Sequence, residues 1–254
     1  MDQQFNPFSL EGKTILITGA TSGIGRQCAI DCAKMGAKVV AIGRNKERLN
    51  SLMTELGEIN AGYIYELQNL NGIKKLIEDI VTEHGKLDGF IHAAGIETTN
   101  PVKLTSIDEY ENLYRVNCLS AFEIIKNLCS IKTFNKKGSI ILISSISGII
   151  ARKGLSAYAA SKGALMSAAK VMALEMASRE IRVNTISPGT ILTPMMQKAL
   201  DAMKEEEQKK RIEGFPLGLG KTSDISNACI FLISDASRWI TGHNLIVDGG
   251  YTVQ

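Results

Sequence analysis

Tyr158 and Lys162 lie four residues apart in a stretch with helical spacing, Tyr158–Ser178. Residues at positions i and i+4 share one face of a helix, so we expect the lysine ammonium near the phenol oxygen. A neighbouring positive charge favours the phenolate and lowers a tyrosine pKa from about 10 toward the working range. The pair therefore predicts a general acid or base that operates near neutral pH.

Ser145 is predicted to lie at the same site as this pair. It stands 13 residues before Tyr158 and follows an apolar run, Ser139–Ser144, that is typical of a buried strand. Parallel α/β sheets place functional groups at the carboxyl ends of their strands. A strand end and the start of the next helix are therefore expected to bring the three side chains together.

A second kind of chemistry is indicated by the glycine-rich segment Thr18–Gly25, TGATSGIG. It links an apolar run, Lys13–Thr18, to a helical stretch, Gly23–Met35. Glycines permit a tight turn and let N–H groups at a helix N-terminus approach a pyrophosphate. In this strand–turn–helix context the pattern predicts a dinucleotide site rather than a glycine-rich turn alone.

The end of the next apolar run, Lys38–Ile42, indicates which dinucleotide is bound. An acidic residue at this place would bind the ribose 2′-hydroxyl of NAD and repel a 2′-phosphate. The sequence instead has a glycine and then Arg44, a permanent cation suited to bidentate phosphate contact. Ser22 and Asn45 are neutral hydrogen-bonding candidates. We expect NADP(H) in preference to NAD(H), the alternative being that Arg44 pairs with Glu47.

These residues are spaced along an alternation of short apolar runs and longer helical stretches. The further strand-like runs are Gly62–Glu66, Leu87–His92, Arg182–Ile186 and Asn244–Val247. The further helical stretches are Lys46–Leu56, Gly72–His84, Ile107–Ile131 and Asp224–Ile233. Continuous apolar strands between helices predict a parallel sheet covered on both faces. We expect one α/β domain over residues 1–254, a doubly wound parallel sheet of about seven strands with helices on both faces.

The alternation stops between Thr193 and Lys221, where no strand is predicted. Acidic and basic residues here are spaced at i and i+4, which predicts a solvated helix. The pairs are Glu205 with Lys209, Glu206 with Lys210 and Glu207 with Arg211. The apolar positions of the same stretch are Met195, Met196, Leu200 and Met203. Methionine-rich faces suit adaptable apolar pockets, so we expect a substrate lid at about residues 193–221.

Composition excludes several classes of protein. Of 254 residues, 44% are hydrophobic and 22% charged, as in folded domains, and a net charge of +3 is too small to indicate nucleic acid. No apolar run approaches the roughly 20 residues of a membrane helix, and residues 1–10 lack a secretory-signal pattern. Five cysteines without CxxC spacing and three scattered histidines indicate reduced thiols and no metal site. We expect a cytoplasmic protein.

Further motifs follow in order: Ala93–Gly95 (AAG), Asn117 within RVNCLSAF, Ser187–Met195 (SPGTILTPM) and Trp239–Gly250 (WITGHNLIVDGG). With the glycine-rich segment and the Ser–Tyr–Lys set, they resemble the classical type of the short-chain dehydrogenase/reductase family over essentially the whole chain. Within that family the sequence is similar to 3-oxoacyl-carrier-protein reductases. The resemblance implies a Rossmann-type fold, a nicotinamide cofactor and Ser–Tyr–Lys chemistry with a supporting asparagine.

The resemblance assigns roles to four catalytic residues. Tyr158 would give its proton to a carbonyl oxygen in reduction or take it from an alcohol in oxidation, and Ser145 would polarise that oxygen. Lys162 would bind the nicotinamide ribose and lower the tyrosine pKa, while Asn117 would kink its helix and hold a water of the proton relay. The expected cofactor contacts are Gly19, Ser22, Gly23, Ile24, Gly25, Arg44, Asn45, Leu67, Ala94, Gly95, Tyr158, Lys162, Pro188, Gly189, Ile191 and Thr193.

The sequence departs from the family pattern at three places. The usual Asn-Asn-Ala-Gly is His92-Ala93-Ala94-Gly95 here, which we expect to alter sheet support more than catalysis, with His92 a strand-end side chain rather than a base. Glu66 stands where the family usually has an aspartate that contacts the adenine amino group. Pro216–Ile225 lacks the usual Arg and Pro, which bears on the hinge of the substrate loop and not on the cofactor site.

The leading interpretation is an NADP(H)-dependent oxidoreductase that interconverts a ketone and a secondary alcohol by hydride transfer. A 3-oxoacyl-thioester reductase is one candidate, for which Lys132, Lys136 and Lys137 form either a basic docking patch or a solvated turn. A reductase or dehydrogenase of a sugar or other small polar ketone is another. A nonenzymatic NADP-binding regulatory protein is the alternative of a different class, although such a protein has no need of the complete catalytic set.

The long helices predicted at Ile107–Ile131 and Tyr158–Ser178 correspond to those through which members of the family commonly form tetramers. The second carries apolar or small residues on several faces, which indicates burial on more than one side. They are Leu165, Met166, Ala168, Ala169, Val171, Met172, Leu174 and Met176. The segment Val247–Tyr251 would supply a second interface along another two-fold axis. We expect a homotetramer, the alternative being a large monomeric core.

Overall fold

The computed structural model describes residues 6–254 and contains a sheet of seven parallel strands. The strands are β1 (Thr14–Thr18), β2 (Lys38–Gly43), β3 (Ala61–Ile64), β4 (Leu87–His92), β5 (Phe134–Ile143), β6 (Arg182–Pro188) and β9 (Asn244–Val247). Their order is β3-β2-β1-β4-β5-β6-β9, so the chain winds outward from β1 in both directions. The predicted doubly wound parallel sheet is confirmed.

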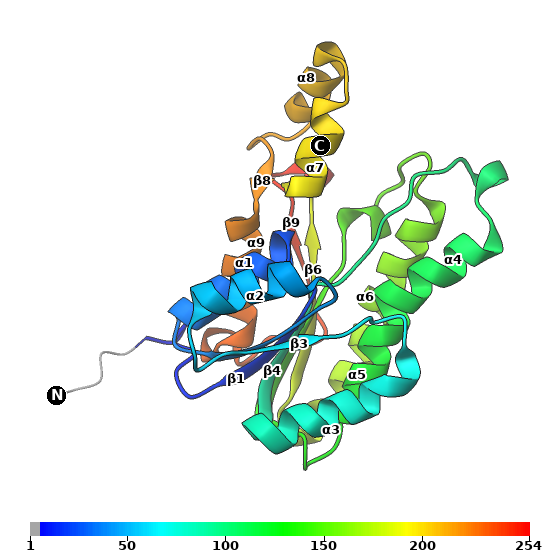
Figure 1. Cartoon of the computed structure of the whole chain (residues 1–254). Helices are drawn as coiled ribbons and strands as arrows, with labels where there is room; N and C mark the ends of the chain where they lie inside the picture. Colours follow the sequence, from blue (N-terminus) through cyan, green and yellow to red (C-terminus); the bar gives the residue numbers. More distant parts are fainter. Residues whose placement is uncertain (1–5) are drawn as a thin grey trace.

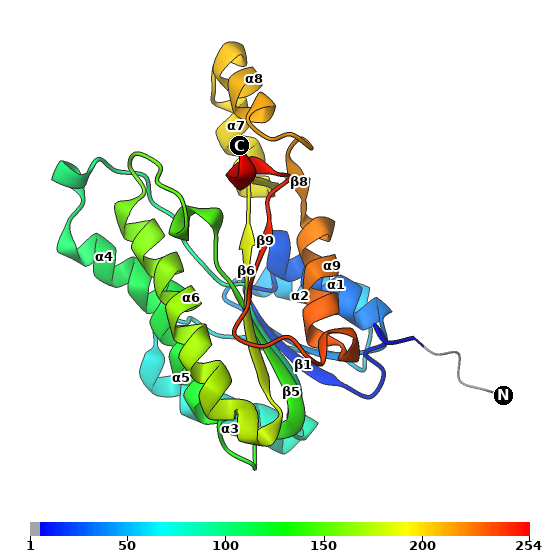
Figure 2. The ribbon, with the colours of Figure 1, turned by 180° about the vertical axis from the view of Figure 1, so that it is seen from behind.

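Helices cover both faces of this sheet (Figures 1 and 2). They are α1 (Gly23–Lys34), α2 (Lys46–Leu56), α3 (Ile73–His84), α4 (Ile107–Tyr114), α5 (Ser120–Leu128), α6 (Ser156–Met176) and α9 (Thr222–Ile233). Helices α1, α2 and α9 pack on one face, and α3, α5 and α6 pack on the other. Among the helices of residues 6–254, none combines the length and the apolar character needed to cross a bilayer.

The burial of strand β1 on both faces explains why its sequence does not alternate between apolar and polar residues. Ile15 and Ile17 belong to the core under α1, α2 and α9, whereas Leu16 belongs to the core on the opposite face. All three side chains are fully buried. Because both faces of the sheet are covered, its carboxyl edge is where polar side chains can reach a ligand.

The predicted helix Ile107–Ile131 is wrong as a single regular element. The chain forms α4, then a π-helical turn over Arg115–Leu119, then α5, which ends at Leu128. A π-helical turn takes up one residue more than an α-helical turn. The apolar periodicity of the sequence therefore continues across it and is displaced by only one position. The sequence pattern therefore indicated helix correctly and did not reveal the interruption.

The segment after β6 leaves the sheet and projects beyond its carboxyl edge (Figure 1). It contains α7 (Pro194–Asp201) and α8 (Glu205–Glu213), flanked by the short strands β7 (Ile191–Leu192) and β8 (Gly220–Lys221). These strands pair in parallel, so the prediction of no strand between Thr193 and Lys221 is wrong at its end. Two-residue strands are set by backbone hydrogen bonds and have no apolar pattern to detect.

The ion pairs predicted in this segment form only in part. Lys210 lies 3.1 Å from Glu206, as predicted, whereas Lys209 pairs with Glu213 at 3.9 Å instead of with Glu205. Between the predicted partners Glu207 and Arg211, which the structure describes, no ion pair forms. The reason is that Arg211 lines a cavity instead. Of the apolar positions, Leu200 is buried, Met196 lines the same cavity, and the side chain of Met195 lies outside the described part.

Candidate active site

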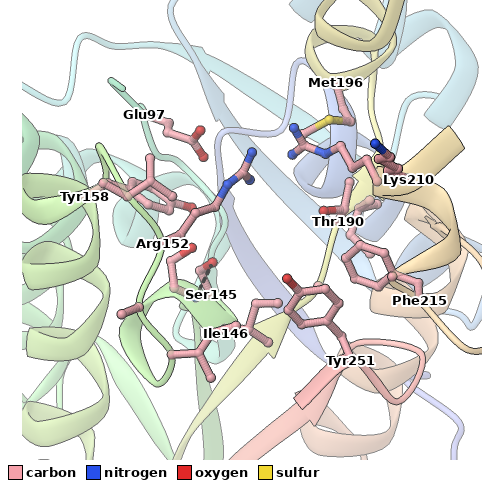
Figure 3. A pocket seen from close by; sticks show the side chains of 18 residues that line it. Glu97, Ser145, Ile146, Arg152, Tyr158, Thr190, Met196, Lys210, Phe215 and Tyr251 are labelled. Carbon is pink, nitrogen blue, oxygen red and sulfur yellow. Dashed lines mark hydrogen bonds between the residues drawn. The ribbon is translucent and has the colours of Figure 1, made fainter. Parts of the chain in front are cut away.

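Three of the cavities near the carboxyl edge of the sheet are each lined by several of the predicted site residues. The Tyr158 cavity, of about 300 Å³, is lined by both Tyr158 and Ser145 (Figure 3). The loop cavity, of about 430 Å³, is lined by the glycines of Thr18–Gly25. The Arg44 cavity, of about 250 Å³, is lined by Arg44 and Leu67. The structure thus brings Ser145 and Tyr158 together in one cavity and most of the predicted dinucleotide residues to the other two.

Tyr158 and Lys162 lie on one face of α6, with Lys162 Nζ 5.7 Å from the centre of the tyrosine ring. Lys162 is buried, and its Nζ donates a hydrogen bond of 2.8 Å to the carbonyl oxygen of Ile143. The pKa of Tyr158 is raised rather than lowered here, because burial and the carboxylate of Glu97 disfavour the phenolate more than the Ser145 hydroxyl favours it. Burial also lowers the pKa of Lys162 to about 8.

Two adjacent serines link the end of β5 to α6. Ser145 begins a short 3₁₀ turn, Ile146–Gly148, and its Oγ accepts a hydrogen bond of 3.1 Å from the Ser147 N–H. Ser144 is buried and donates a hydrogen bond of 2.8 Å to the carbonyl oxygen of Lys162. Because this bond ties the strand end to the helix, Ser145 and Tyr158 are held on the wall of one cavity.

Asn117 lies at the centre of the π-helical turn and is fully buried. Its Oδ1 accepts from the Ile96 N–H at 2.8 Å, and its Nδ2 donates to the Ile96 carbonyl oxygen and to Ser161 Oγ, each at 3.0 Å. The helix is therefore interrupted at the residue where the resemblance implies a kink. The side chain fixes the loop after β4 against α6, which places it behind the cavity wall.

His92 is fully buried at the end of β4, and its Nδ1 lies 2.9 Å from Thr18 Oγ1 at the end of β1. Burial and the charge of Lys162 lower the pKa of His92 to about 3, so the ring is neutral at neutral pH. Its Nε2 has no hydrogen-bond partner among residues 6–254. A neutral ring that joins two strand ends agrees with the expected role in sheet support.

The glycine-rich loop has the geometry that a pyrophosphate site requires. Gly19 has φ +67°, and a Cβ there would lie 2.7 Å from the Cα of Ala94. A Cβ on Gly25 would lie 2.4 Å from the carbonyl oxygen of Gly19. Ser22 precedes α1 and makes no side-chain capping bond, and the first turn of α1 holds no acidic residue. The exposed N–H groups and the positive end of the helix dipole therefore fit a dinucleotide.

The Arg44 cavity differs in two respects from expectation. Arg44 Nη1 lies 3.5 Å from Glu66 Oε2, so its acidic neighbour is Glu66 and not Glu47. Asn45 caps α2, with its Oδ1 accepting a hydrogen bond of 2.8 Å from the Arg48 N–H. Arg48, which sequence reasoning missed, lines both this cavity and the loop cavity. Its place in the first turn of α2, four residues after Arg44, was the available signal.

The remaining predicted cofactor residues mostly border these cavities. Ser22, Gly23, Ile24, Gly25, Ala94, Gly95 and Thr193 line the loop cavity, and Gly189 and Ile191 line the Tyr158 cavity. Pro188 and Lys162 are buried and do not line any of the three.

The predicted basic docking patch lies at the wrong end of the sheet. Lys132 precedes β5, and Lys136 and Lys137 are in its first half, whereas the active-site end of this strand is Ile143. At roughly 3.3 Å per residue, Lys137 lies about 20 Å along the strand from that end. All three lysines are exposed. They are solvated, as the alternative held, although only Lys132 lies in a turn and the other two belong to β5.

Four charged side chains of the Tyr158 cavity were missed by sequence reasoning: Glu97, Arg152, Lys210 and Arg211. Glu97 follows β4, Arg152 precedes α6, and the other two belong to α8. Figure 3 shows Glu97 and Arg152 on the same side of the cavity as Tyr158, with Lys210 opposite. Because charged residues are usually solvated, the sequence did not indicate that these four line a cavity. The one available signal was the position of Arg152 between Ser145 and Tyr158.

A doubly wound parallel sheet with a glycine loop at a helix N-terminus and a Tyr–Lys pair at its carboxyl edge defines a nicotinamide-dependent dehydrogenase or reductase. A family model described as enoyl-(acyl carrier protein) reductase matches residues 19–252. The chain is 33% identical over 249 residues to a 3-oxoacyl-[acyl-carrier-protein] reductase of Thermotoga maritima, covering 96% of this chain and 99% of the relative. It is 31% identical to a D-threitol dehydrogenase of Mycolicibacterium smegmatis, covering 97% of this chain and 95% of the relative.

A solved dehydrogenase/reductase from Sinorhizobium meliloti 1021 has a TM-score of 0.89 to this structure at 28% identity, covering 96% of this chain and 97% of that one. The chain belongs to the classical short-chain dehydrogenase/reductase family. It is an oxidoreductase that acts on alcohol and ketone groups with a nicotinamide dinucleotide. The alternative of a nonenzymatic NADP-binding regulatory protein is therefore not supported.

Proposed function

We propose that the enzyme interconverts a ketone and a secondary alcohol using NADP(H). The observation that carries this proposal is the meeting of Ser145 and Tyr158 in one cavity, with Lys162 buried 5.7 Å from the tyrosine ring. When bound, the nicotinamide supplies a hydride to the carbonyl carbon or accepts one from the alcohol. The residues of the chain orient the substrate and move the proton that balances the hydride.

In the reductive direction Tyr158 donates its phenolic proton to the carbonyl oxygen, and the phenolate is reprotonated from water. The raised pKa keeps the phenol protonated at neutral pH, which suits it to this general-acid step. Ser145 hydrogen-bonds the same oxygen and polarises it. Lys162 holds the nicotinamide ribose and stabilises the transient phenolate, and Asn117 maintains the turn behind them and holds a relay water.

A panel of ketones and alcohols assayed for NADPH and NADP consumption tests this function. Identity to a 3-oxoacyl-carrier-protein reductase supports including 3-oxoacyl thioesters, and identity to D-threitol dehydrogenase supports including sugars and polyols. We expect turnover with at least one class of carbonyl compound. If neither cofactor is consumed or formed with any of them, the proposed function is wrong.

The preference for NADP(H) is supported by two arginines at the Arg44 cavity. The side chain of Arg44 is 66% exposed, and Arg48 lies beside it on the cavity wall. Two guanidinium groups are suited to a ribose 2′-phosphate, for which Arg44 would exchange its contact with Glu66. Asn45 is committed to capping α2, so it contributes less than the sequence indicated.

Arg44→Ala is expected to weaken NADPH binding by on the order of 1.5–3 kcal/mol, because one charge-assisted contact is lost. This corresponds to a rise in Kd of roughly 10- to 150-fold, while the Kd for NADH changes little. Lys46→Ala is the matched control, since Lys46 is exposed and does not line these cavities. Fluorescence titration of both cofactors measures the effect. Equal losses for NADPH and NADH contradict a 2′-phosphate site.

We further propose that residues 1–254 form a single domain and that residues 193–221 act on it as a substrate lid. Residues 1–5 of this domain lie outside the part that the structure describes. Helices α7 and α8 carry Met196 and Arg211 to the Tyr158 cavity. The base of the segment is held by the β7–β8 pair and by stacking of Phe215 on Tyr251, whose ring centres are 4.4 Å apart. An arm that is anchored at its base and lines the cavity is suited to opening and closing over substrate.

We propose a cytoplasmic homotetramer. On α6, Val171 and Leu174 are 56% and 80% exposed, although apolar, and Val253 near the C-terminus is 87% exposed. Light scattering at micromolar concentration is expected to give about four times the chain mass of 27.6 kDa. A Leu174→Glu variant should shift the mass downward. A wild-type mass near 27.6 kDa contradicts the proposal, and the mass of a dimer would mean that only one of the two proposed interfaces forms.

The cytoplasmic location is supported by the free cysteines, four of which are buried, because reduced thiols are typical of a reducing compartment.

A further inference from the structure

The Tyr158 cavity carries more positive charge than the reduction of a ketone requires. Arg152, Lys210 and Arg211 line it, and Glu97 is the one acidic side chain among its described lining residues. The cationic groups come from two separate elements, the loop before α6 and helix α8. Lys210 is paired with Glu206, so a neutral substrate would leave the two arginines without a charged partner inside the cavity.

The two arginines are not neutralised by the protein. Among residues 6–254, neither Arg152 nor Arg211 makes an ion pair. Arg211 is half-buried, and its pKa is lowered by burial and by the charge of Arg152, against the opposite effect of Glu97. Two guanidinium groups that repel each other across a cavity are stabilised by an anion bound between them.

Resting on the proposed function, we propose that the substrate is a ketone or secondary alcohol that carries a carboxylate or a phosphate. Arg152 and Arg211 bind this anionic group while Ser145 and Tyr158 hold the oxygen that is reduced or formed. The anionic group itself is unchanged in the reaction. Because planar guanidinium groups bind oxyanions bidentately, the pair also fixes the orientation of the reacting carbon.

The size and lining of the cavity favour a small anionic substrate over the two candidates from the sequence. A volume of about 300 Å³ is at the lower end for ligand sites. A long acyl chain would place apolar groups against Arg152 and Arg211, and a neutral sugar would leave both charges unpaired. Since Arg211 belongs to α8 and Arg152 to the loop before α6, an anion held by both would also join the proposed lid to the catalytic wall.

Matched pairs of ketones that differ in charge test this proposal. The carboxylate arm compares 3-oxobutanoate and 4-oxopentanoate with their methyl esters, and the phosphate arm compares hydroxyacetone phosphate with hydroxyacetone. We expect kcat/KM to be at least about tenfold higher for the anion in one arm, which identifies the group. In Arg152→Gln/Arg211→Gln this ratio is expected to fall by about tenfold or more. Lys153→Gln and Lys209→Gln are matched controls that retain it, because both lysines are exposed and do not line the cavity.

Calorimetry of NADP-saturated enzyme with malonate and with inorganic phosphate gives a readout independent of turnover. Saturation with NADP prevents the probe anions from binding at the cofactor phosphate sites. We expect binding to the wild type and to both lysine variants, and loss of binding in the double variant, or in the single variants if the double variant does not fold. Equal kcat/KM for anion and neutral ester in both arms, or anion binding unaffected by the substitutions, overturns the proposal. If no ketone is reduced, the proposed function fails and calorimetry alone decides whether the anion site exists.

Discussion

Replacing Tyr158 by phenylalanine is expected to lower kcat by about 10²- to 10⁴-fold, because general acid–base catalysis contributes an effect of this size. The substitution removes one oxygen and keeps the ring that lines the cavity. Packing and cofactor affinity are therefore expected to change little, and the loss should fall on kcat at saturating substrate. Steady-state kinetics and titration with NADPH measure the two quantities separately.

Tyr63→Phe is the matched control for this loss. Tyr63 lies on β3, and its hydroxyl bonds Glu83 and His84 away from the three cavities. The control is expected to retain wild-type turnover. If Tyr158→Phe retains activity within tenfold of the wild type, Tyr158 is not the proton donor.

Lys162→Met is expected to remove activity and to stabilise the folded protein. Turnover and cofactor affinity both fall, since Lys162 is assigned to the ribose and to the phenolate. Burial lowers the pKa of Lys162 from 10.5 to about 8, so keeping it charged at pH 7 costs on the order of 3 kcal/mol. Methionine fills the same space without a charge. We expect a gain of about 1–3 kcal/mol in the free energy of unfolding, reduced by the lost bond to Ile143.

The same group makes wild-type stability depend on pH. Between about pH 8 and pH 10.5 the unfolded lysine still holds a proton that the folded one has lost, so the free energy of unfolding rises with pH over this window. In Lys162→Met this contribution to the rise is absent. Urea unfolding of both proteins at about pH 7 and about pH 10 measures the difference. Lys74→Met, an exposed lysine on α3, should retain the wild-type slope. A variant that is less stable than the wild type at pH 7 contradicts the argument.

The sheet could be predicted from sequence because its evidence is local and repeated. Each strand is a short run such as Leu87–His92, apolar on both faces, and each crossover supplies a helix. The glycine loop was equally accessible, since Gly19 and Gly25 have backbone positions that no other residue fits without movement. The Tyr158 and Lys162 pair was found from helical spacing together with Ser145 at the end of the preceding strand.

Properties that depend on three-dimensional surroundings could not be predicted in this way. The raised pKa of Tyr158 follows from burial and from Glu97, which is distant in the chain. Arg152 and Arg211 meet at one cavity only because α8 projects over the carboxyl edge, and nothing in the sequence context of Arg211 indicates this. The prediction of a basic docking patch at Lys132 was wrong for the same reason. The sequence shows that the lysines form a cluster but not at which end of the strand the cluster lies.

The π-helical turn makes one part of the chain sensitive to its length. Because the wide turn takes up one extra residue, deleting a single residue from Arg115–Leu119 would let α4 run into α5 as a regular helix and leave the buried face of α5 nearly unchanged. Ile124 and Leu128 would stay buried against the sheet, whereas Asn117 would lose the position from which it bonds Ile96. Deleting a residue within α5 would instead rotate the rest of that helix by about 100° about its axis. A one-residue deletion in the π-helical turn would therefore spare the fold and remove the support of the site, so homologous chains that retain activity should keep the residue number here.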